Sequence, residues 1–232
     1  MNTNPLNHKV QRAFKRFIDI AIALAVLILT WPILAGIALA IKLDSKGPVF
    51  YRHRRIGKDG DPFHLYKFRT MVSGGDDSGY MRYLRELIES ERDGSSRGLP
   101  YAKMAGDSRV TRLGQVLRCY YLDELPQLIN IIKGEMSLVG PRPHVQFEVD
   151  NYTPDQWRRL SVKPGATGLC QVAGKADCTF TELIDLDLQY IESWNLWYDV
   201  KIIFMTGSIM LRGGEKFWAR MTKQVPEKVE MG

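Results

Sequence analysis

Two adjacent carboxylates and a proline-flanked arginine are the residues of this chain best suited to chemistry. Asp123 and Glu124 stand side by side in a segment that closes on Pro141-Arg142-Pro143. Carboxylates can act as nucleophiles or metal ligands, and an arginine presented on a rigid turn can bind a phosphate. The combination favours chemistry on a phosphate. The alternative is that the two carboxylates only cap a helix, which is a common use of Asp.

A helix is expected to position this pair. Apolar residues recur at spacings of three and four, which is the pattern of one helix face; they are Leu122, Leu125, Leu128, Ile129 and Ile132. The pattern predicts a helix with Asp123 near its N-cap and Pro126 in its first turn, where the missing N–H costs little. The partial positive charge of a helix N-terminus would favour an ionised carboxylate.

Two basic and aromatic segments upstream are expected to form a hairpin. Residues 49–56 and 63–71 read as strands separated by a Gly- and Asp-rich turn. Lys67 and Arg69 alternate with aromatic residues, so both cations are expected on one face. They can serve the same phosphate chemistry, or form a solvated basic face near anionic lipid.

The N-terminal third is basic and contains a long apolar run. Residues 1–72 hold 12 Lys/Arg and 4 Asp/Glu, whereas the remainder holds 20 and 22. Residues 20–41 carry no charge, a length that can span a bilayer as a helix. Pro32 interrupts this run, and basic flanks favour the cytoplasmic side for both ends. Two topologies stay open: a re-entrant helix-break-helix, or a spanning helix with a proline kink.

The pattern as a whole predicts an α+β chain, mostly helical, in three parts. Residues 1–44 form a basic N-terminus and a membrane helix interrupted near Pro32. Residues 45–211 form a small globular domain with amphipathic interfacial helices and a surface insertion at about 73–106. Residues 212–232 form a basic C-terminal tail. The three cysteines show no pairing or metal-binding pattern.

Six ordered stretches of the chain resemble the monotopic polyprenyl-phosphate phosphoglycosyl transferases. These are the bacterial sugar transferases that begin exopolysaccharide, O-antigen and glycoprotein glycan assembly. The matching stretches are KRFIDIAIA at 15–23, the proline-broken apolar run, the segment 42–71 ending in YKFRTM, the segment 107–143 ending in SLVGPRP, KPGATGLCQVAGK at 163–175, and LDLQYIESWNLWYDVKII at 186–203.

The resemblance implies an enzyme in the bacterial inner (cytoplasmic) membrane, monotopic, with its catalytic domain facing the cytoplasm. Such an enzyme moves a sugar-1-phosphate from a UDP-sugar to polyprenyl (undecaprenyl) phosphate, releases UMP and needs Mg²⁺. The implied partners are therefore the UDP-sugar, the polyprenyl phosphate and membrane lipids, with no nucleic acid. A homo-oligomer stays open.

The resemblance also assigns roles to individual residues. Asp123 corresponds to the nucleophile, which would form a covalent aspartyl phospho-sugar intermediate, and Glu124 to its dyad partner. Either or both would hold Mg²⁺, and the sequence does not separate these roles. The positions expected near the phosphates are Lys67, Arg69, Arg118, Pro141, Arg142 and Pro143.

A membrane-anchored interaction protein is the competing hypothesis. Its basic third would bind anionic lipid or nucleic acid, which explains the charge and the apolar run. It does not explain why an Asp-Glu pair accompanies a Pro-Arg-Pro turn. Within the resemblance, Leu169-Cys170-Gln171 departs from the Trp-Ala-Gln of many relatives, so the sugar is left open.

Overall fold

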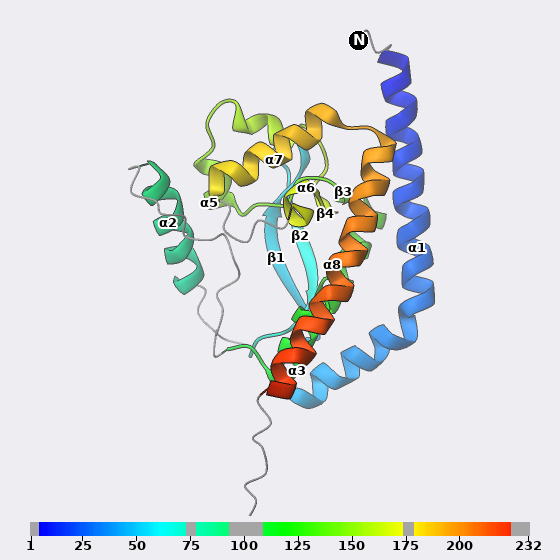
Figure 1. Cartoon of the computed structure of the whole chain (residues 1–232), viewed down its shortest axis with the longest axis vertical. Coiled ribbons are helices and arrows are strands. Elements are labelled where there is room, and N and C mark those ends of the chain that lie inside the picture. Colours follow the sequence, from blue (N-terminus) through cyan, green and yellow to red (C-terminus); the bar gives the residue numbers. More distant parts are fainter. Residues whose placement is uncertain (1–4, 73–77, 93–108, 174–178, 224–232) are drawn as a thin grey trace, which may run out of the picture.

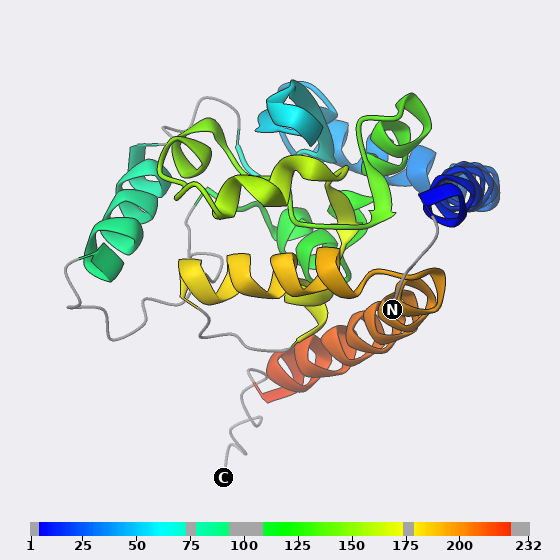
Figure 2. The same ribbon diagram turned by 90° about the horizontal axis from the view of Figure 1, so that it is seen from above.

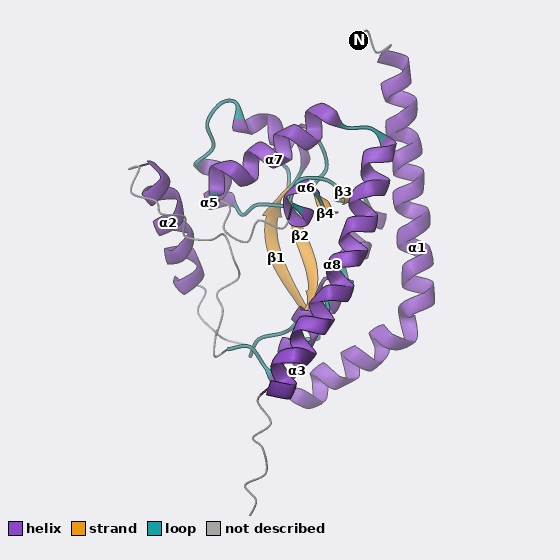
Figure 3. Cartoon of the chain, in the orientation of Figure 1, coloured by secondary structure: helices purple, strands orange, loops and turns teal. Residues whose placement is uncertain are grey.

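The computed structural model describes residues 5–72, 78–92, 109–173 and 179–223, and this part of the chain is mostly helical around two small sheets (Figures 1 and 3). The α+β, mostly helical class is therefore confirmed. The elements are α1 Pro5–Asp44, β1 Phe50–Ile56, η1 Lys58–Gly60, β2 Pro62–Phe68, α2 Ser78–Arg92, α3 Arg112–Cys119, η2 Leu122–Glu124, α4 Gln127–Lys133, β3 Ser137–Val139, α5 Gln146–Asp150, η3 Gln156–Ser161, β4 Gly165–Thr167, α6 Leu169–Val172, α7 Phe180–Ser193 and α8 Leu196–Lys223, where η denotes a 3₁₀-helix.

The predicted hairpin is present as β1 and β2. The strands pair antiparallel, with a register that runs from Phe50 opposite Phe68 to Ile56 opposite Pro62. Alternate side chains of β2 are buried, including Phe63 and Leu65, as expected for a strand with one face on the core. These two residues pack in one cluster with Leu128 and Ile131 of α4, so the hairpin and the helix after the dyad share a core.

The second sheet brings the Pro-Arg-Pro segment against the glycine-rich segment. β3 and β4 pair in parallel, with Ser137 opposite Gly165. Just beyond this pair Gly140 and Gly165 approach so closely that a Cβ on Gly165 would lie 2.1 Å from the Gly140 nitrogen. Only glycine allows this contact. The chain entering Pro141 is therefore fixed against the start of β4.

Helix α1 is a continuous helix that bends in its second half, where it is drawn in lighter blue (Figure 1). The sequence leaves open a break or a kink at Pro32, and the structure has one bent helix with Pro32 inside it. A proline removes a single intrahelical bond, so the neighbouring bonds can keep the helix whole while it kinks. By length and composition, one helix of the described residues, Val10–Asp44 within α1, could cross a membrane.

The start of α1 is bound to the globular part by charged side chains. The Arg16 guanidinium donates to the carbonyl oxygens of Ile131 at 2.6 Å and Ile132 at 2.9 Å, in the last turn of α4. The Lys15 ammonium lies 2.5 Å from the Asp199 carboxylate of α8. Cations suit the carbonyl end of a helix, because its dipole is negative there. The first turns of α1 are thereby attached to α4 and α8.

The end of α1 is bound to the same globular part. The buried Arg69 guanidinium, just beyond β2, donates to the carbonyl oxygens of Ile41, Ser45 and Lys46 at 3.2, 2.6 and 3.0 Å. Ile41 itself is 2% exposed and packs with residues of β2 and α3. Both ends of α1 therefore contact the domain that carries the hairpin and the dyad.

The predicted insertion and tail are described only in part. Within 73–106 the structure describes α2, whose buried Leu84 and Leu87 face inward; it packs against α7 and lies on the opposite side of the molecule from α1 (Figures 1 and 2). Residues 73–77 and 93–106 lie outside the described residues. Helix α8 continues to Lys223, so the first part of the predicted tail at 212–232 is helical, and 224–232 lie outside the description.

Candidate active site

The dyad lies in a 3₁₀ turn between two helices. Helix α3 ends at Cys119, and Tyr121 then adopts a left-handed conformation with φ 57°, which is uncommon for a bulky residue. Asp123 and Glu124 follow in η2, and α4 begins at Gln127 with Pro126 as its N-cap. The prediction that Asp123 stands near the helix N-cap is therefore wrong, because the chain turns through η2 before the helix begins.

The two carboxylates differ in their surroundings. Asp123 is 4% exposed and lies under the turn, whereas Glu124 is less buried. The Lys67 ammonium of β2 lies 2.6 Å from the Glu124 Oε1, and both side chains are 19% exposed. A charge-assisted hydrogen bond of this length fixes Glu124 in one orientation. The hairpin therefore places the Lys67 cation directly on Glu124 of the dyad.

Several charges meet at Lys67. Burial lowers the pKa of the Lys67 ammonium, the carboxylates of Glu124 and Asp123 oppose this, and the Arg142 guanidinium lowers the pKa further. Both carboxylates and Arg142 therefore lie within electrostatic reach of one ammonium. Two cations from distant segments therefore share one site with the Asp-Glu pair.

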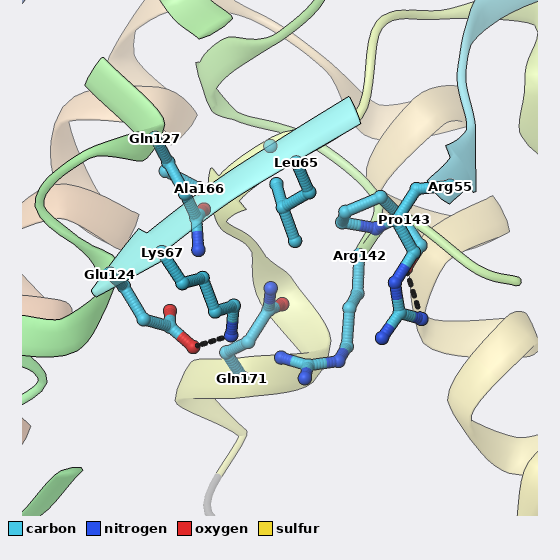
Figure 4. A pocket seen from close by; sticks show the side chains of 10 residues that line it. Arg55, Leu65, Lys67, Glu124, Gln127, Arg142, Pro143, Ala166 and Gln171 are labelled. Carbon is cyan, nitrogen blue, oxygen red and sulfur yellow. Dashed lines mark hydrogen bonds and ion pairs between the residues drawn. The ribbon is translucent and has the colours of Figure 1, made fainter. Parts of the chain in front are cut away.

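The Arg142 side chain enters the same pocket as Lys67 and Glu124 (Figure 4). Its guanidinium points toward the Gln171 amide and the Lys67 ammonium. The full lining consists of Arg55, Leu65, Lys67, Glu124, Gln127, Arg142, Pro143, Gly165, Ala166 and Gln171. A pocket with two facing cations and a carboxylate suits a ligand that carries negative charge and hydroxyl groups.

The other predicted phosphate-binding cations are engaged elsewhere. Arg69 binds the carbonyl oxygens at the end of α1, and it does not line the pocket. Arg118 donates from its Nε to the Thr70 hydroxyl at 2.8 Å and is also outside the lining. Pro143 lines the pocket with Arg142, and Pro141 borders a neighbouring hollow behind the turn. The prediction that Lys67 and Arg69 point to one face is therefore wrong, because Lys67 lines the pocket and Arg69 binds the end of α1.

Sequence reasoning missed several residues that line or border the pocket. Gln127 faces it as an amide that belongs to no recognisable motif, whereas Gln171 is the glutamine of the stretch that aligns with the Trp-Ala-Gln of relatives. Arg55 lies in the basic segment after the apolar run, which gives it no signal of its own. His53 lies on β1 opposite Leu65, and burial together with Arg55 and Lys67 lowers the pKa of its imidazole to about 3. A neutral imidazole beside a group of cations has no sequence signal, because the group forms only in the fold.

The site fits a metal ion that arrives with its ligand better than a preformed metal cage. The described residues contain no group of three or more His, Cys, Asp or Glu side chains placed to hold a metal ion. Mg²⁺ is commonly bound by one or two carboxylates together with substrate phosphates and waters. Asp123 and Glu124 supply hard oxygen donors of this kind, although Lys67 competes for Glu124. The donor set is therefore compatible with Mg²⁺ in the presence of a diphosphate.

Comparison with known proteins points to one family. A sequence model described as bacterial sugar transferase matches residues 10–213, which include all the site residues discussed above.

Curated relatives match over most of the chain. It is 37% identical over 209 residues to the undecaprenyl-phosphate galactose phosphotransferase of Salmonella typhimurium, covering 90% of the chain and 43% of that relative. It is 41% identical over 192 residues to the exopolysaccharide production protein ExoY of Rhizobium meliloti, covering 83% of each. It is 38% identical over 205 residues to the UDP-glucose:undecaprenyl-phosphate glucose-1-phosphate transferase of Escherichia coli, covering 85% of the chain and 40% of that relative. The chain thus spans less than half of two of these relatives and most of the third.

Proposed function

The chain belongs to the bacterial sugar transferase family, and we propose that it transfers a sugar-1-phosphate from a UDP-sugar to undecaprenyl phosphate, with release of UMP. The observation that carries the proposal is the pocket in which Lys67 and Arg142 lie with Glu124, while the buried Asp123 next to Glu124 acts electrostatically on the same Lys67 ammonium. A diphosphate is an anion that needs such cations, and the carboxylate beside them can act on its phosphorus. The names of two relatives specify galactose and glucose, which makes these sugars the first candidates.

The first half-reaction forms a covalent intermediate on Asp123. A carboxylate oxygen of Asp123 attacks the phosphorus that bears the sugar. The bond from that phosphorus to the bridging oxygen breaks, and UMP leaves with the electron pair. Lys67 and Arg142 offset the repulsion between the attacking carboxylate and the diphosphate, which is the main obstacle to this attack. Lys67 also holds Glu124 at 2.6 Å, which keeps the second carboxylate at the site.

The second half-reaction releases the product to the lipid. A phosphate oxygen of undecaprenyl phosphate attacks the same phosphorus, the bond to Asp123 breaks, and the carboxylate is restored. The soluble donor and the lipid acceptor then use one carboxylate in turn, so two difficult encounters are separated in time. Mg²⁺, held by Asp123, Glu124 or both, would neutralise charge on the diphosphate and on the departing UMP.

A monotopic, re-entrant placement in the bacterial inner membrane, with the domain on the cytoplasmic side, is part of the same proposal. It is supported by the two attachments of α1: Arg16 binds the domain near the start of the helix, and Arg69 binds the helix end. One globular domain cannot bind both ends of a helix that crosses the bilayer, because those ends emerge on opposite faces. The side chains between them include exposed Ile28, Leu29 and Trp31, which suit hydrocarbon.

Helix α8 offers a second apolar surface that suits the interface. Trp197, Phe204 and Leu211 are 75%, 76% and 77% exposed, and their spacing of seven places them on one face of the helix. Exposed apolar side chains in a row of this kind are typical of helices that lie at a membrane surface. The Lys15 contact to Asp199 joins the start of α8 to α1.

The direct test is UMP release from a panel of UDP-sugars, including UDP-galactose and UDP-glucose, with undecaprenyl phosphate and Mg²⁺. The proposal predicts UMP and a lipid-linked sugar phosphate with at least one donor, and neither product with Asp123→Asn. A membrane-anchored interaction protein would bind anionic vesicles and release no UMP. Absence of UMP with every donor in the panel would reject the proposed function.

A further inference from the structure

Each backbone polar group of the Pro141-Arg142-Pro143 turn has an assigned contact. Two prolines leave the tripeptide with one N–H and three carbonyl groups. The Gly165 N–H donates to the Pro141 oxygen at 2.8 Å, the Arg159 guanidinium donates to the Arg142 oxygen, and the Arg55 guanidinium donates to the Pro143 oxygen at 3.2 Å. The Arg142 N–H interacts with the Asp187 carboxylate. The backbone of the turn is therefore held from several sides, and the Arg142 side chain projects into the pocket.

Arg159 is the centre of these contacts. It comes from η3, and its side chain is 1% exposed. Its Nε donates to the Asp187 Oδ2 at 2.7 Å, its Nη1 donates to the Tyr152 hydroxyl oxygen at 2.7 Å, and its Nη2 donates to the Arg142 carbonyl. A planar guanidinium can serve three partners in fixed directions at once, which a lysine ammonium cannot match.

Tyr152, which binds Arg159, is itself held by a second hydrogen bond. The Tyr152 hydroxyl lies 2.7 Å from the Nδ1 of His144, which is fully buried. Burial, and the nearby arginines, lower the pKa of His144, so the ring is neutral near pH 7. Since Arg159 can only donate, the Tyr152 oxygen accepts from it, and the same hydroxyl shares a second hydrogen bond with His144. The Tyr152 hydroxyl is therefore held between Arg159 and His144.

The Arg159–Asp187 pair is fully withdrawn from water. Both side chains are 1% exposed, and the two residues lie 28 positions apart in the sequence. Burial raises the pKa of the Asp187 carboxyl, while Arg159 and the Arg142 N–H oppose the rise. Burying two charges is costly, and apolar residues could join η3 to α7 with less penalty. The pair makes a contact that apolar residues could not, because it binds both the N–H side and the carbonyl side of Arg142.

We propose that Arg159 and Asp187 are positioning residues that fix the backbone of Arg142 so that its guanidinium meets the diphosphate of the donor. The inference deepens the proposed function and rests on it for the identity of the ligand. Neither residue lines the pocket that holds Lys67, Glu124 and Arg142, so both act through Arg142. The competing explanation is that the buried pair only stabilises the packing of η3 on α7.

The test replaces the whole pair so that no buried charge is left alone. The variant Arg159→Met/Asp187→Leu keeps the volume and removes both charges. The matched control is Arg158→Gln/Glu192→Gln, whose pair joins the same two elements at 2.6 Å but is 52% and 57% exposed and away from the turn. The first variant is expected to lose 10- to 100-fold in kcat/KM for the UDP-sugar, on the order expected for a displaced binding group, and the control about twofold or less.

A double-mutant cycle that combines the apolar pair with Arg142→Ala shows whether the pair positions Arg142 or only stabilises the fold. If the pair acts through Arg142, its removal in the Arg142→Ala background lowers kcat/KM by about twofold or less, because the group that it positions is already absent. Losses that multiply in the combined variant would overturn the inference. If the Arg159→Met/Asp187→Leu variant does not fold, Arg159→Lys replaces it. This variant keeps the positive charge opposite Asp187 but lacks the planar guanidinium that reaches the Arg142 carbonyl.

The same cycle measured by UDP binding distinguishes this inference from the proposed function. Titration calorimetry with UDP and Mg²⁺ needs no turnover. If no UDP-sugar yields UMP but UDP affinity falls non-additively in the cycle, the transferase proposal fails and the positioning role stands. If UDP affinity falls additively, or the folded apolar-pair variant binds UDP as tightly as the wild type, the positioning role is wrong. A wild-type protein that binds no UDP would overturn both.

Discussion

Replacement of Lys67 by methionine should lower kcat/KM and should also change how the free energy of unfolding depends on pH. The substitution keeps the length of the side chain and removes the ammonium that lies 2.6 Å from Glu124, at a site where each side chain is only 19% exposed. Loss of one preorganised charged donor in a poorly hydrated site costs about 3 kcal/mol, roughly 100-fold in kcat/KM. Steady-state UMP release from the best UDP-sugar measures this loss.

The same variant has a signature in the pH dependence of folding. The pKa of Lys67 is lowered from 10.5 chiefly by burial, so between its folded pKa and 10.5 the unfolded chain binds the proton and the folded chain does not. In that window the Lys67 contribution to the free energy of unfolding rises with pH, by at most about 1.4 kcal/mol per pH unit. Kinetic activity should fall in the same window, because the uncharged amine no longer offsets the diphosphate charge.

Comparison of wild type with Lys67→Met isolates the Lys67 contribution from that of the buried Tyr152 and Tyr190, whose pKa values are raised by burial. Urea unfolding of both proteins across the alkaline range should show the rise only in the wild type. Lys58→Met is the matched control, since the Lys58 pair with Asp59 is 45% and 65% exposed and contributes about 0–1 kcal/mol. Lys67→Met with wild-type kcat/KM, or with an unchanged pH profile of stability, would refute the placement of this charge at the site.

Three further predictions concern the turn and the membrane helix. Arg142→Ala should fold normally and lose most UMP release, with Lys rescuing poorly because it lacks the fork that binds phosphate; full turnover in the alanine variant would contradict the phosphate role. Arg69→Met should lower the free energy of unfolding by about 3 kcal/mol, since three carbonyls at the end of α1 lose a buried donor, and an unchanged urea midpoint would exclude this anchor. Single cysteines at positions 8 and 46 should both resist a membrane-impermeant reagent in intact cells; labelling of one end alone would mean that α1 crosses the bilayer.

Local patterns were sufficient for the hairpin and for the class of the fold. The strands of β1 and β2 follow from alternation and a Gly-Asp turn, which depend only on neighbouring residues. The first residue of α4 could not be predicted from the sequence. Spacing alone cannot distinguish a turn of α-helix from the 3₁₀ turn η2, which follows Tyr121. Arg69 follows Lys67 by two positions, but its guanidinium is buried against the end of α1, a contact that alternation cannot reveal.

The site depended on contacts between distant segments. Residue types and the resemblance to known transferases point to Asp123, Glu124 and Arg142, and the structure brings Lys67 into one pocket with Glu124 and Arg142. Gln127 has no such signal, because it belongs to no motif and reaches the pocket only through the fold. The Arg159–Asp187 pair had none, since one sequence does not show that residues 28 positions apart will meet.

The covalent step on Asp123 is the central claim, and one single-turnover measurement tests it most directly. Enzyme is mixed with a UDP-sugar and Mg²⁺ in the absence of any lipid, UMP is quantified, and the peptides are examined by mass spectrometry. The account predicts up to about one equivalent of UMP per enzyme and a phospho-sugar adduct on the peptide that contains Asp123, both absent in Asp123→Asn, whose amide is a poor nucleophile. UMP that appears only after undecaprenyl phosphate is added, with no adduct, would contradict the account and leave Asp123 as a metal ligand or a general base.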